Sequence, residues 1–503
     1  MSLLRNSVVN FLAGLLPAVT LLVTMPFIVR GLGDAHYGLL VLISAVMGYF
    51  AVIDINIAAG ATKYVSEFHA RGDQASESAV MNLALAISMA IGLLGAAMMW
   101  AGDDWLVDHA LQVPAPQHDL GLRYLHLAAV GFLVAQVQQA LQSLPQAVQR
   151  YSLSASCEAA FGVLVPVLTV LALSLGGGLY EVLLVRVVLS ALNMGVLLVM
   201  VRHLFPHWRW VWPDAMLRRT VLSFSGYTYL GRLASLTYFH ADKFIISAML
   251  GLEAVSYYAI ASTIANRLLS LTFRFSSVIY PAASALAVQG RWEELRQAYF
   301  KTSRYVFFIN ACAVALVCLF AREILFYWMG PRFADAGWVV VSVVALGMLV
   351  DSASNLPSLV NDGMGHSRLT GLFAISRAIF GVAVVVLGTY CFGLNGVAFG
   401  HLLASLVVVC AFLWAVHRYT IPFKLRDYVR NCYPLAFAVL APALLAAAEF
   451  HTAEVYTLTQ MALASVLLTA LMAVLAWRRV LAPEDRARVL SRLQRRGAQG
   501  PSA

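Results

Sequence analysis

The stretch LGRLASLTYFHADKFIISAMLG, residues 230–251, has the length and apolar character of a membrane span, yet it contains Arg232, Asp242 and Lys243. About 20 apolar residues cross a hydrocarbon core of roughly 30 Å. A charged side chain facing lipid at the bilayer centre would cost about 2.5–3.5 kcal/mol. The stretch therefore predicts a membrane protein that keeps these charges away from lipid.

Composition extends this prediction to the whole chain. Hydrophobic residues make up 61% and charged residues 12% of the 503 residues, and the mean hydropathy is +0.78. Soluble proteins average about 25% charged residues. The sequence predicts an all-α integral membrane protein. We expect about fourteen spans, at 6–30, 37–62, 79–101, 122–144, 155–176, 179–202, 221–250, 254–281, 303–325, 337–360, 369–391, 395–417, 433–450 and 455–477.

Basic residues predict the orientation of these spans. If the N-terminus lies inside, the outer segments hold only Arg30, Arg322 and Arg332, and the other basic residues between spans lie inside. This positive-inside pattern predicts that both termini are cytoplasmic. The net charge of +9 is spread over inner loops and a basic tail. Attraction to an anionic inner leaflet accounts for it, and no nucleic-acid partner is expected.

The sequence gives little indication of a disulfide framework, a metal site or an enzyme active site. The six cysteines lie in or beside spans without CxxC spacing, so neither a disulfide framework nor a metal site is expected. The longest outer loop, 102–121, is too short for a catalytic ectodomain, and no GxxxxGK[ST] phosphate loop occurs. We predict that the chain is not an enzyme and needs no cofactor, although H+ or Na+ could couple to its activity.

An internal repeat recurs at an offset of about 212–220 residues. GLGDAHYGLLVL (31–42) parallels LGLEAVSYYAIA (250–261), and AFGVLVPVL (160–168) parallels IFGVAVVVL (379–387). GLYEV (178–182) parallels GLNGV (393–397), and LP recurs at 144–145 and 356–357. Six spans per copy make the repeats parallel, so two lobes should enclose a central cavity. The predicted division is an N-lobe (1–205), a cytoplasmic linker (206–220), a C-lobe (221–420), two extra spans (421–480) and a basic cytoplasmic tail (481–503).

Three stretches carry a family resemblance. They are PFIVRGLGDAHYGLLVL (26–42), DINIAAGATKYVSEFHARGD (54–73) and DKFIISAMLGLEAVSYYAIA (242–261), and they resemble the polysaccharide transporter family of the MOP exporter superfamily. That family contains the Wzx-type flippases. The resemblance implies a multi-pass protein of the bacterial inner membrane that moves undecaprenyl-pyrophosphate-linked oligosaccharides from the inner to the outer leaflet. The pathways implied are O-antigen, capsule or exopolysaccharide synthesis, and the partners are this cargo, membrane lipids and other polysaccharide-assembly membrane proteins.

Polar residues mark faces of several spans. In 254–281, a stripe formed by Thr263, Arg267, Ser270, Arg274 and Ser277 follows the helical period, so it must face water or a partner. Arg232 and Lys243 are eleven residues apart and share one face of their helix, whereas Asp242 lies on an adjoining face. An internal ion pair and a cavity lining both remain open for these three charges.

The predicted site draws on several spans. We count as intramembrane six basic residues, Arg186, Arg232, Lys243, Arg267, Arg274 and Arg377, and four acidic ones, Asp54, Glu158, Asp242 and Asp351. This balance favours an anionic cargo, and arginine suits phosphate. Amides and hydroxyls near Gln139 and Asn355 suit sugars, or bonds between helices. The hypothetical substrate-binding residues are Arg232, Lys243, Arg267, Arg274, Arg377, Gln139 and Asn355. The hypothetical ion-coupling or gate residues are Asp54, Asp242 and Asp351.

The repeat suggests one gate pair in particular. At an offset near 219, Asp54 aligns with Arg274, so the two could meet at an inner gate; alternatively, each charge pairs within its own lobe.

Three other functions stay open at this point. A peptidoglycan-precursor flippase and a cation-coupled drug exporter belong to the same superfamily, and a polysaccharide polymerase or ligase is the enzyme alternative. Drug exporters prefer an acidic cavity, and polymerases carry a long outer loop. Glycosyltransferase genes beside this one would indicate a polysaccharide cluster.

The orientation can be tested with single cysteines in a cysteine-free background. We expect a cysteine at position 110 to react with a membrane-impermeant reagent from outside, because it lies in an outer loop. A cysteine at position 290 should react only from inside. Labelling of position 290 in intact cells would overturn the orientation.

Overall fold

The computed structural model is helical, and the residues that it describes contain no strand. These residues are 2–54, 56–113, 117–148, 150–276, 283, 286–287, 289–450, 456–487 and 491. Of these, the side chains of residues 2–14, 151–152, 224, 226–240, 267–276 and 448–450 are not described. Contacts divide the chain into two compact units, Met1–Ala259 and Ile260–Ala503. The lobe boundaries expected from the repeat are not tested by this division and remain a prediction.

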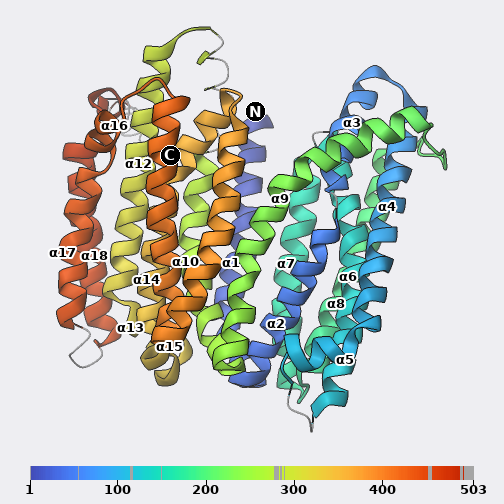
Figure 1. Cartoon of the computed structure of the whole chain (residues 1–503), viewed down its shortest axis with the longest axis horizontal. Coiled ribbons are helices and arrows are strands. Elements are labelled where there is room, and N and C mark those ends of the chain that lie inside the picture. Colours follow the sequence, from blue (N-terminus) through green and yellow to red (C-terminus); the bar gives the residue numbers. More distant parts are fainter. Residues whose placement is uncertain are drawn as a thin grey trace, which may run out of the picture. The chain divides into compact units, whose positions relative to one another are not determined.

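Long helices that pack along one another build the first unit (Figure 1). α6 packs against both α4 and α8, and α7 packs against α1 and α8. The elements of this unit are α1 (Ser2–Leu32), α2 (Asp34–Phe50), η1 (Ala51–Ile53), α3 (Ile57–Arg71), α4 (Gln74–Ala101), α5 (Asp103–Trp105), η2 (Leu106–Ala110), α6 (His118–Ala147), α7 (Tyr151–Ser174), α8 (Leu179–Leu204), α9 (Ala215–Leu250) and the first turns of α10 (Leu252–Ser276).

In the second unit, α14 packs against α12, α13 and α15, and α12 also packs against α17. Its elements are the rest of α10, α12 (Trp292–Leu319), α13 (Ala321–Met329), α14 (Pro331–Gly363), α15 (Ser367–Tyr419), α16 (Leu425–Cys432), α17 (Pro434–Phe450), α18 (Leu458–Leu475) and η4 (Ala476–Val480). The 53-residue α15 contains two expected spans, which meet at a kink where Gly393 has φ 57° and ψ −136°.

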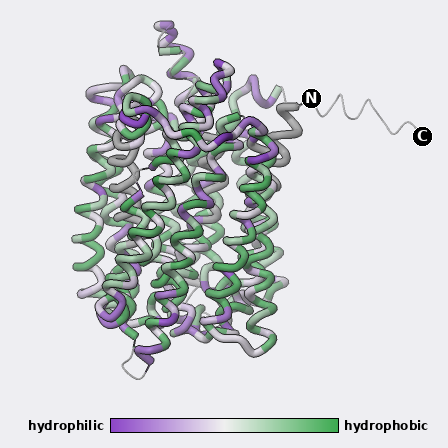
Figure 2. Tube along the Cα trace, turned by 90° about the vertical axis from the view of Figure 1, so that its right-hand side faces the viewer, coloured by the Kyte–Doolittle hydropathy of each residue, from purple (hydrophilic) through white to green (hydrophobic). Residues whose placement is uncertain are grey.

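The helices confirm an all-α membrane fold. Within the described residues, ten helices are long and apolar enough to cross a membrane, or eleven if the bent pair α16 and α17 counts as one span. Hydrophobic residues run along the helices, and hydrophilic residues gather at their ends (Figure 2). Each of the fourteen expected spans falls largely on a helix. The lower count arises because α15 holds two spans, and because α9 and α10 are described only in part.

The second span is broken, whereas the sequence predicted one continuous segment at 37–62. α2 ends at Phe50, a 3₁₀ turn follows, and α3 begins at Ile57. Asn56 adopts the left-handed conformation with φ 58°, which asparagine tolerates better than most residues. Its backbone N–H donates to Asp54 Oδ1 at 3.0 Å. The side chain of Asp54 thus takes up a backbone group that the broken helix leaves free.

A glycine with positive φ directly precedes each of the helices α2 and α10. Gly33 precedes α2 with φ 78° and ψ 161°, and Gly251 precedes α10 with φ 88° and ψ 176°. Only glycine adopts this conformation readily. The two helix starts also contact each other: the Ser256 hydroxyl donates to the Asp34 carbonyl, and a Cβ on Gly38 would lie 2.0 Å from the Leu252 carbonyl oxygen.

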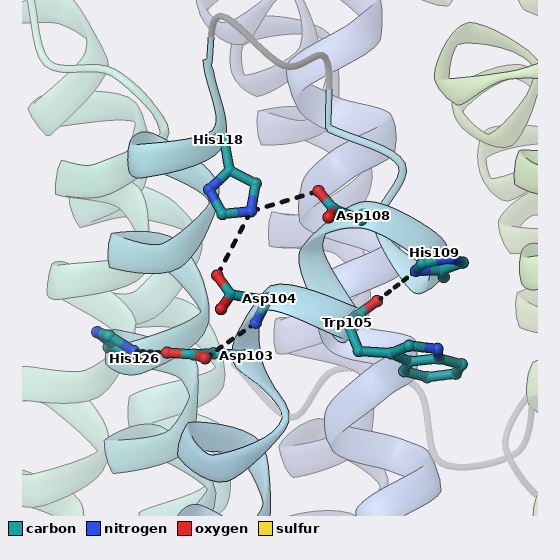
Figure 3. A network of polar contacts seen from close by, with 7 residues as sticks. All are labelled: Asp103, Asp104, Trp105, Asp108, His109, His118 and His126. Carbon is teal, nitrogen blue, oxygen red and sulfur yellow. Dashed lines mark hydrogen bonds and ion pairs between the residues drawn. The ribbon is translucent and has the colours of Figure 1, made fainter.

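The connection between α4 and α6 carries a network of acidic and histidine side chains (Figure 3). His118 Nε2 lies 3.3 Å from an Asp108 oxygen and 3.7 Å from an Asp104 oxygen. His126 Nε2 lies 2.8 Å from Asp103 Oδ2. The hydrogen bond with His126 lowers the pKa of the Asp103 carboxyl below its ordinary value. These contacts fasten the connection to the start of α6.

The close approach at Gly38 generates a prediction about stability. Gly38→Ala should lower the free energy of unfolding by about 1–3 kcal/mol, because the added methyl meets backbone that cannot move aside easily. The measurement is the melting temperature of the purified protein. Gly195→Ala is the matched control, since nothing lies within 4 Å of its Cβ position on α8. Equal melting temperatures for the two variants would refute the close packing of α2 against α10.

Candidate functional site

A buried arginine–carboxylate pair joins α14 to α15 in the second unit. The Arg377 guanidinium donates to Asp351 Oδ2 and to the Ser405 hydroxyl, the latter at 3.1 Å. The Arg377 side chain is 18% exposed and the Asp351 side chain 27%. Asp351 Oδ1 is buried and accepts no hydrogen bond from the described part of the chain. One carboxylate oxygen is therefore committed to the pair, and the other is open to a further donor or cation.

A cavity of about 150 Å³ lies beside this pair. Hydroxyl groups, aromatic rings and the arginine side chain share its wall, which is a combination that can bind both phosphate and sugar. The lining residues are Ser354, Ser358, Thr370, Phe373, Ala374, Arg377, Val408, Val409 and Phe412. Both ends of α15 contribute, because its kink at Gly393 folds residues 408–412 back beside residues 370–377.

The turn between α14 and α15 positions one wall of this cavity. Thr370 donates its hydroxyl hydrogen to Asp362 Oδ1 at 2.6 Å. Asn361, which is fully buried, donates through Nδ2 to the Thr370 hydroxyl and the His366 carbonyl, both at 2.9 Å. This network fixes the first turn of α15, so Thr370 presents its side chain at a set position.

In the first unit, charges gather at two places. Asp54 is 3% exposed at the break in the second span, where it binds the Asn56 backbone. Asp242 on α9 is 7% exposed, and its Oδ1 lies 3.2 Å from Nζ of the adjacent Lys243. The ring of Phe244, next in the chain, packs edge to face on Tyr49 of α2. An internal ion pair was one of the two alternatives that the sequence analysis left open for this span.

The structure brings only some of the predicted site residues together. Asp351 and Arg377 contact each other directly, and Asn355 is half-buried on the same helix as Asp351. Gln139 is exposed on α6. The side chains of Arg232, Arg267 and Arg274 lie outside the described residues, so the polar stripe on α10 and the proposed Asp54–Arg274 gate remain predictions.

The sequence analysis did not assign three residues that the structure places at the site: Ser405, Thr370 and Phe373. Ser405 is buried and binds Arg377, although the two are 28 residues apart. The expected spans 369–391 and 395–417 were a signal for this contact, because two consecutive spans joined by a short turn run antiparallel. Sequence spacing alone does not reveal which residues of those spans face each other.

A family model described as polysaccharide biosynthesis protein matches residues 3–287, which is more than half of the chain. The chain belongs to this family. The expected family is therefore confirmed. The match includes α1 to α10 and ends before α12 begins.

Named relatives agree with this family. A Shigella flexneri protein provisionally named as an O-antigen transporter is 18% identical over 408 residues, which cover 79% of this chain and 94% of the relative. An uncharacterised Bacillus subtilis membrane protein named EpsK is 26% identical over 352 residues, which cover 67% of this chain and 69% of the relative.

Solved structures show the same fold. The lipid II flippase MurJ in an inward closed conformation matches with a TM-score of 0.72 at 12% identity, covering 95% of this chain and all of MurJ. An inward-facing MATE multidrug transporter of the MOP superfamily matches with a TM-score of 0.71 at 15% identity, covering 84% of this chain and 99% of the transporter. The predicted MOP superfamily fold is confirmed.

The Asp351–Arg377 pair generates the next prediction. Arg377→Gln and Asp351→Asn should each destabilise the protein, because each leaves one charge without its partner in a largely buried site. The double variant should be more stable than the sum of the single effects implies, with a coupling energy of about 1–3 kcal/mol. The measurement is the melting temperature of the wild type, the two single variants and the double variant, which together form a double-mutant cycle.

The Arg322–Asp335 pair provides the control. Its carboxylate is 68% exposed, so a cycle at this pair should give a coupling energy below about 1 kcal/mol. If the two cycles gave the same coupling energy, the buried pair would have no special contribution to stability.

Proposed function

We propose that this protein is a flippase that moves undecaprenyl-pyrophosphate-linked oligosaccharides from the inner to the outer leaflet of the bacterial inner membrane. The product would supply O-antigen, capsule or exopolysaccharide synthesis. Membership of the polysaccharide biosynthesis family and the name of the Shigella flexneri relative support this class of cargo.

The observation that carries the proposal is the cavity beside Arg377. Its hydroxyl groups can exchange hydrogen bonds with sugar hydroxyls, and its aromatic rings can pack on sugar faces. A guanidinium can bind two oxygens of a phosphate at once, which an ammonium group cannot do. Sugar and pyrophosphate are the two polar parts of the proposed cargo, so one cavity wall suits both.

Transport would proceed by alternating access, in which the protein exposes its binding groups first to one side and then to the other. Cargo binding can bias such an equilibrium only through different affinities for the two states. Directed transport therefore needs either consumption of the cargo outside or a coupling ion, for which H+ and Na+ are the candidates. Asp54, Asp242 and Asp351 are the proposed ion-coupling or gate residues.

We also propose that both termini are cytoplasmic. The proposed protein partners are other polysaccharide-assembly membrane proteins, which receive the cargo. The fold similarity to MurJ and to the MATE transporter does not distinguish their cargos from this one, because identities of 12% and 15% establish the fold alone. A transport assay must decide between the cargo classes.

The test is complementation of a strain that lacks this gene, with the export of surface polysaccharide as the measurement. Arg267→Ala and Arg274→Ala should abolish export at normal protein abundance, because the cargo pyrophosphate loses its guanidinium partners. Lysine at either position should retain partial function as a point charge. Arg377→Gln should also reduce export, with abundance checked separately since this change affects folding.

Arg332→Gln is the control, because Arg332 is exposed at the start of α14 and outside the proposed site. It should export normally. Full complementation by both alanine variants would show that the α10 stripe is structural. The protein can also be tested in reconstituted vesicles. If it transports a peptidoglycan precursor and not the oligosaccharide, the proposed cargo is wrong and the peptidoglycan precursor is the cargo.

A further inference from the structure

An arginine without an acidic partner lies where α12 meets the last span and the tail. Arg304 of α12 is half-buried, and its Nε is buried without a hydrogen-bond partner in the described residues. Its guanidinium carbon lies 5.6 Å from the centre of the Tyr305 ring. No described carboxylate lies within ion-pair distance of it. A half-buried guanidinium in this state keeps donors that an external anion or water can satisfy.

The neighbouring positive charge, in contrast, is neutralised by the tail. Asp485 Oδ2 lies 2.5 Å from Nζ of Lys301 and accepts a hydrogen bond from the Tyr305 hydroxyl at 2.8 Å. The Ala482 backbone N–H donates to the same hydroxyl, also at 2.8 Å. The tail thereby docks on α12 and brings the end of η4 beside it, but it leaves Arg304 unpaired.

The charge balance at this place is strongly positive. Residues 300–306 of α12, η4 and residues 481–487 of the docked tail hold five basic residues against two acidic ones. The basic residues are Lys301, Arg304, Arg478, Arg479 and Arg486, and the acidic ones are Glu484 and Asp485. Arg478 and Arg479 are exposed. This surplus of positive charge attracts an anion to the end of α18.

A lipid-facing surface leads directly to these charges. Leu463, Leu467, Leu471 and Val474 of α18 recur at helical spacing and are 50–64% exposed. Arg478 follows Val474 by one turn, about 6 Å along the axis. Trp477 lies between them, and tryptophan favours the headgroup region of a bilayer. An acyl chain along α18 would place its headgroup phosphate at the level of these arginines.

We propose that Arg304, with Arg478 and Arg479, binds the phosphate of an anionic glycerophospholipid in the leaflet where the C-terminal tail emerges. The guanidinium of Arg304 supplies the buried part of the site, and the η4 arginines supply its rim. The apolar face of α18 favours a lipid over a soluble phosphate, because it offers the acyl chains a surface that continues into the site. This site is separate from the proposed cargo site and does not depend on the identity of the cargo.

The test measures lipid retention by the purified full-length protein with native mass spectrometry, using phosphatidylglycerol, phosphatidylcholine and inorganic phosphate as probes. The wild type should retain phosphatidylglycerol in preference to phosphatidylcholine. Arg304→Gln should weaken phosphatidylglycerol binding about fivefold, the change expected for about 1 kcal/mol per basic residue at a membrane surface. Arg304→Lys should weaken it less. Arg332→Gln is the matched control, since it removes the same charge from an exposed position on α14 and should leave binding unchanged.

A second variant tests the site without changing position 304, where a substitution could cause misfolding. Arg478→Gln combined with Arg479→Gln changes only exposed side chains and should also weaken phosphatidylglycerol binding. The proposal fails if the wild type does not prefer phosphatidylglycerol, or if Arg304→Gln and Arg332→Gln bind it equally. It also fails if millimolar inorganic phosphate displaces the lipid, because the site would then select a soluble anion.

Discussion

Hydrocarbon offers no hydrogen-bond partner, so each polar group within the membrane must be satisfied by the protein itself or by water in a cavity. Two ion pairs among the described residues follow that constraint at short range. Arg377 binds Asp351 and Ser405, and Lys243 binds its neighbour Asp242. Each of these contacts lies within one unit.

The same constraint explains how the second span tolerates a break. An interrupted helix frees backbone N–H groups, and a free N–H in hydrocarbon is costly. Asp54 accepts the Asn56 N–H and is itself 3% exposed, so one of the freed groups is satisfied locally. Gly33 and Gly251 solve a related problem before α2 and α10, where φ angles of 78° and 88° favour glycine. Breaks and turns are thus built from residues chosen for backbone conformation, whereas the spans between them need only be apolar.

This difference decides how much of the fold the sequence reveals. Hydropathy locates the spans, because it is an average over about 20 residues. The break at Asp54 and Asn56 escapes such an average, since Val52 and Ile53 keep the window apolar. The pair of Asp351 and Arg377 could be suspected from charge alone. Its third member, Ser405, could not, because a hydroxyl in a span gives no signal until the kink in α15 places it beside the guanidinium. Gln139, which helical spacing put in a polar ladder, is exposed on α6, and its contact with a sugar stays a prediction.

The arrangement at Arg377 also constrains how the proposed cargo could bind. If a phosphate takes the guanidinium donor away from Asp351, both oxygens of this carboxylate lack a donor, because Oδ1 already accepts no hydrogen bond from the described residues. An uncompensated carboxylate in a largely buried site is strongly unfavourable, so a proton or a metal cation at Asp351 would relieve the cost. Linkage is reciprocal: if a cation at Asp351 strengthens anion binding at Arg377, then the anion strengthens cation binding by the same factor. On the proposed function, the buried pair would therefore couple cargo and cation through a single shared guanidinium, with no need for a signal between distant sites.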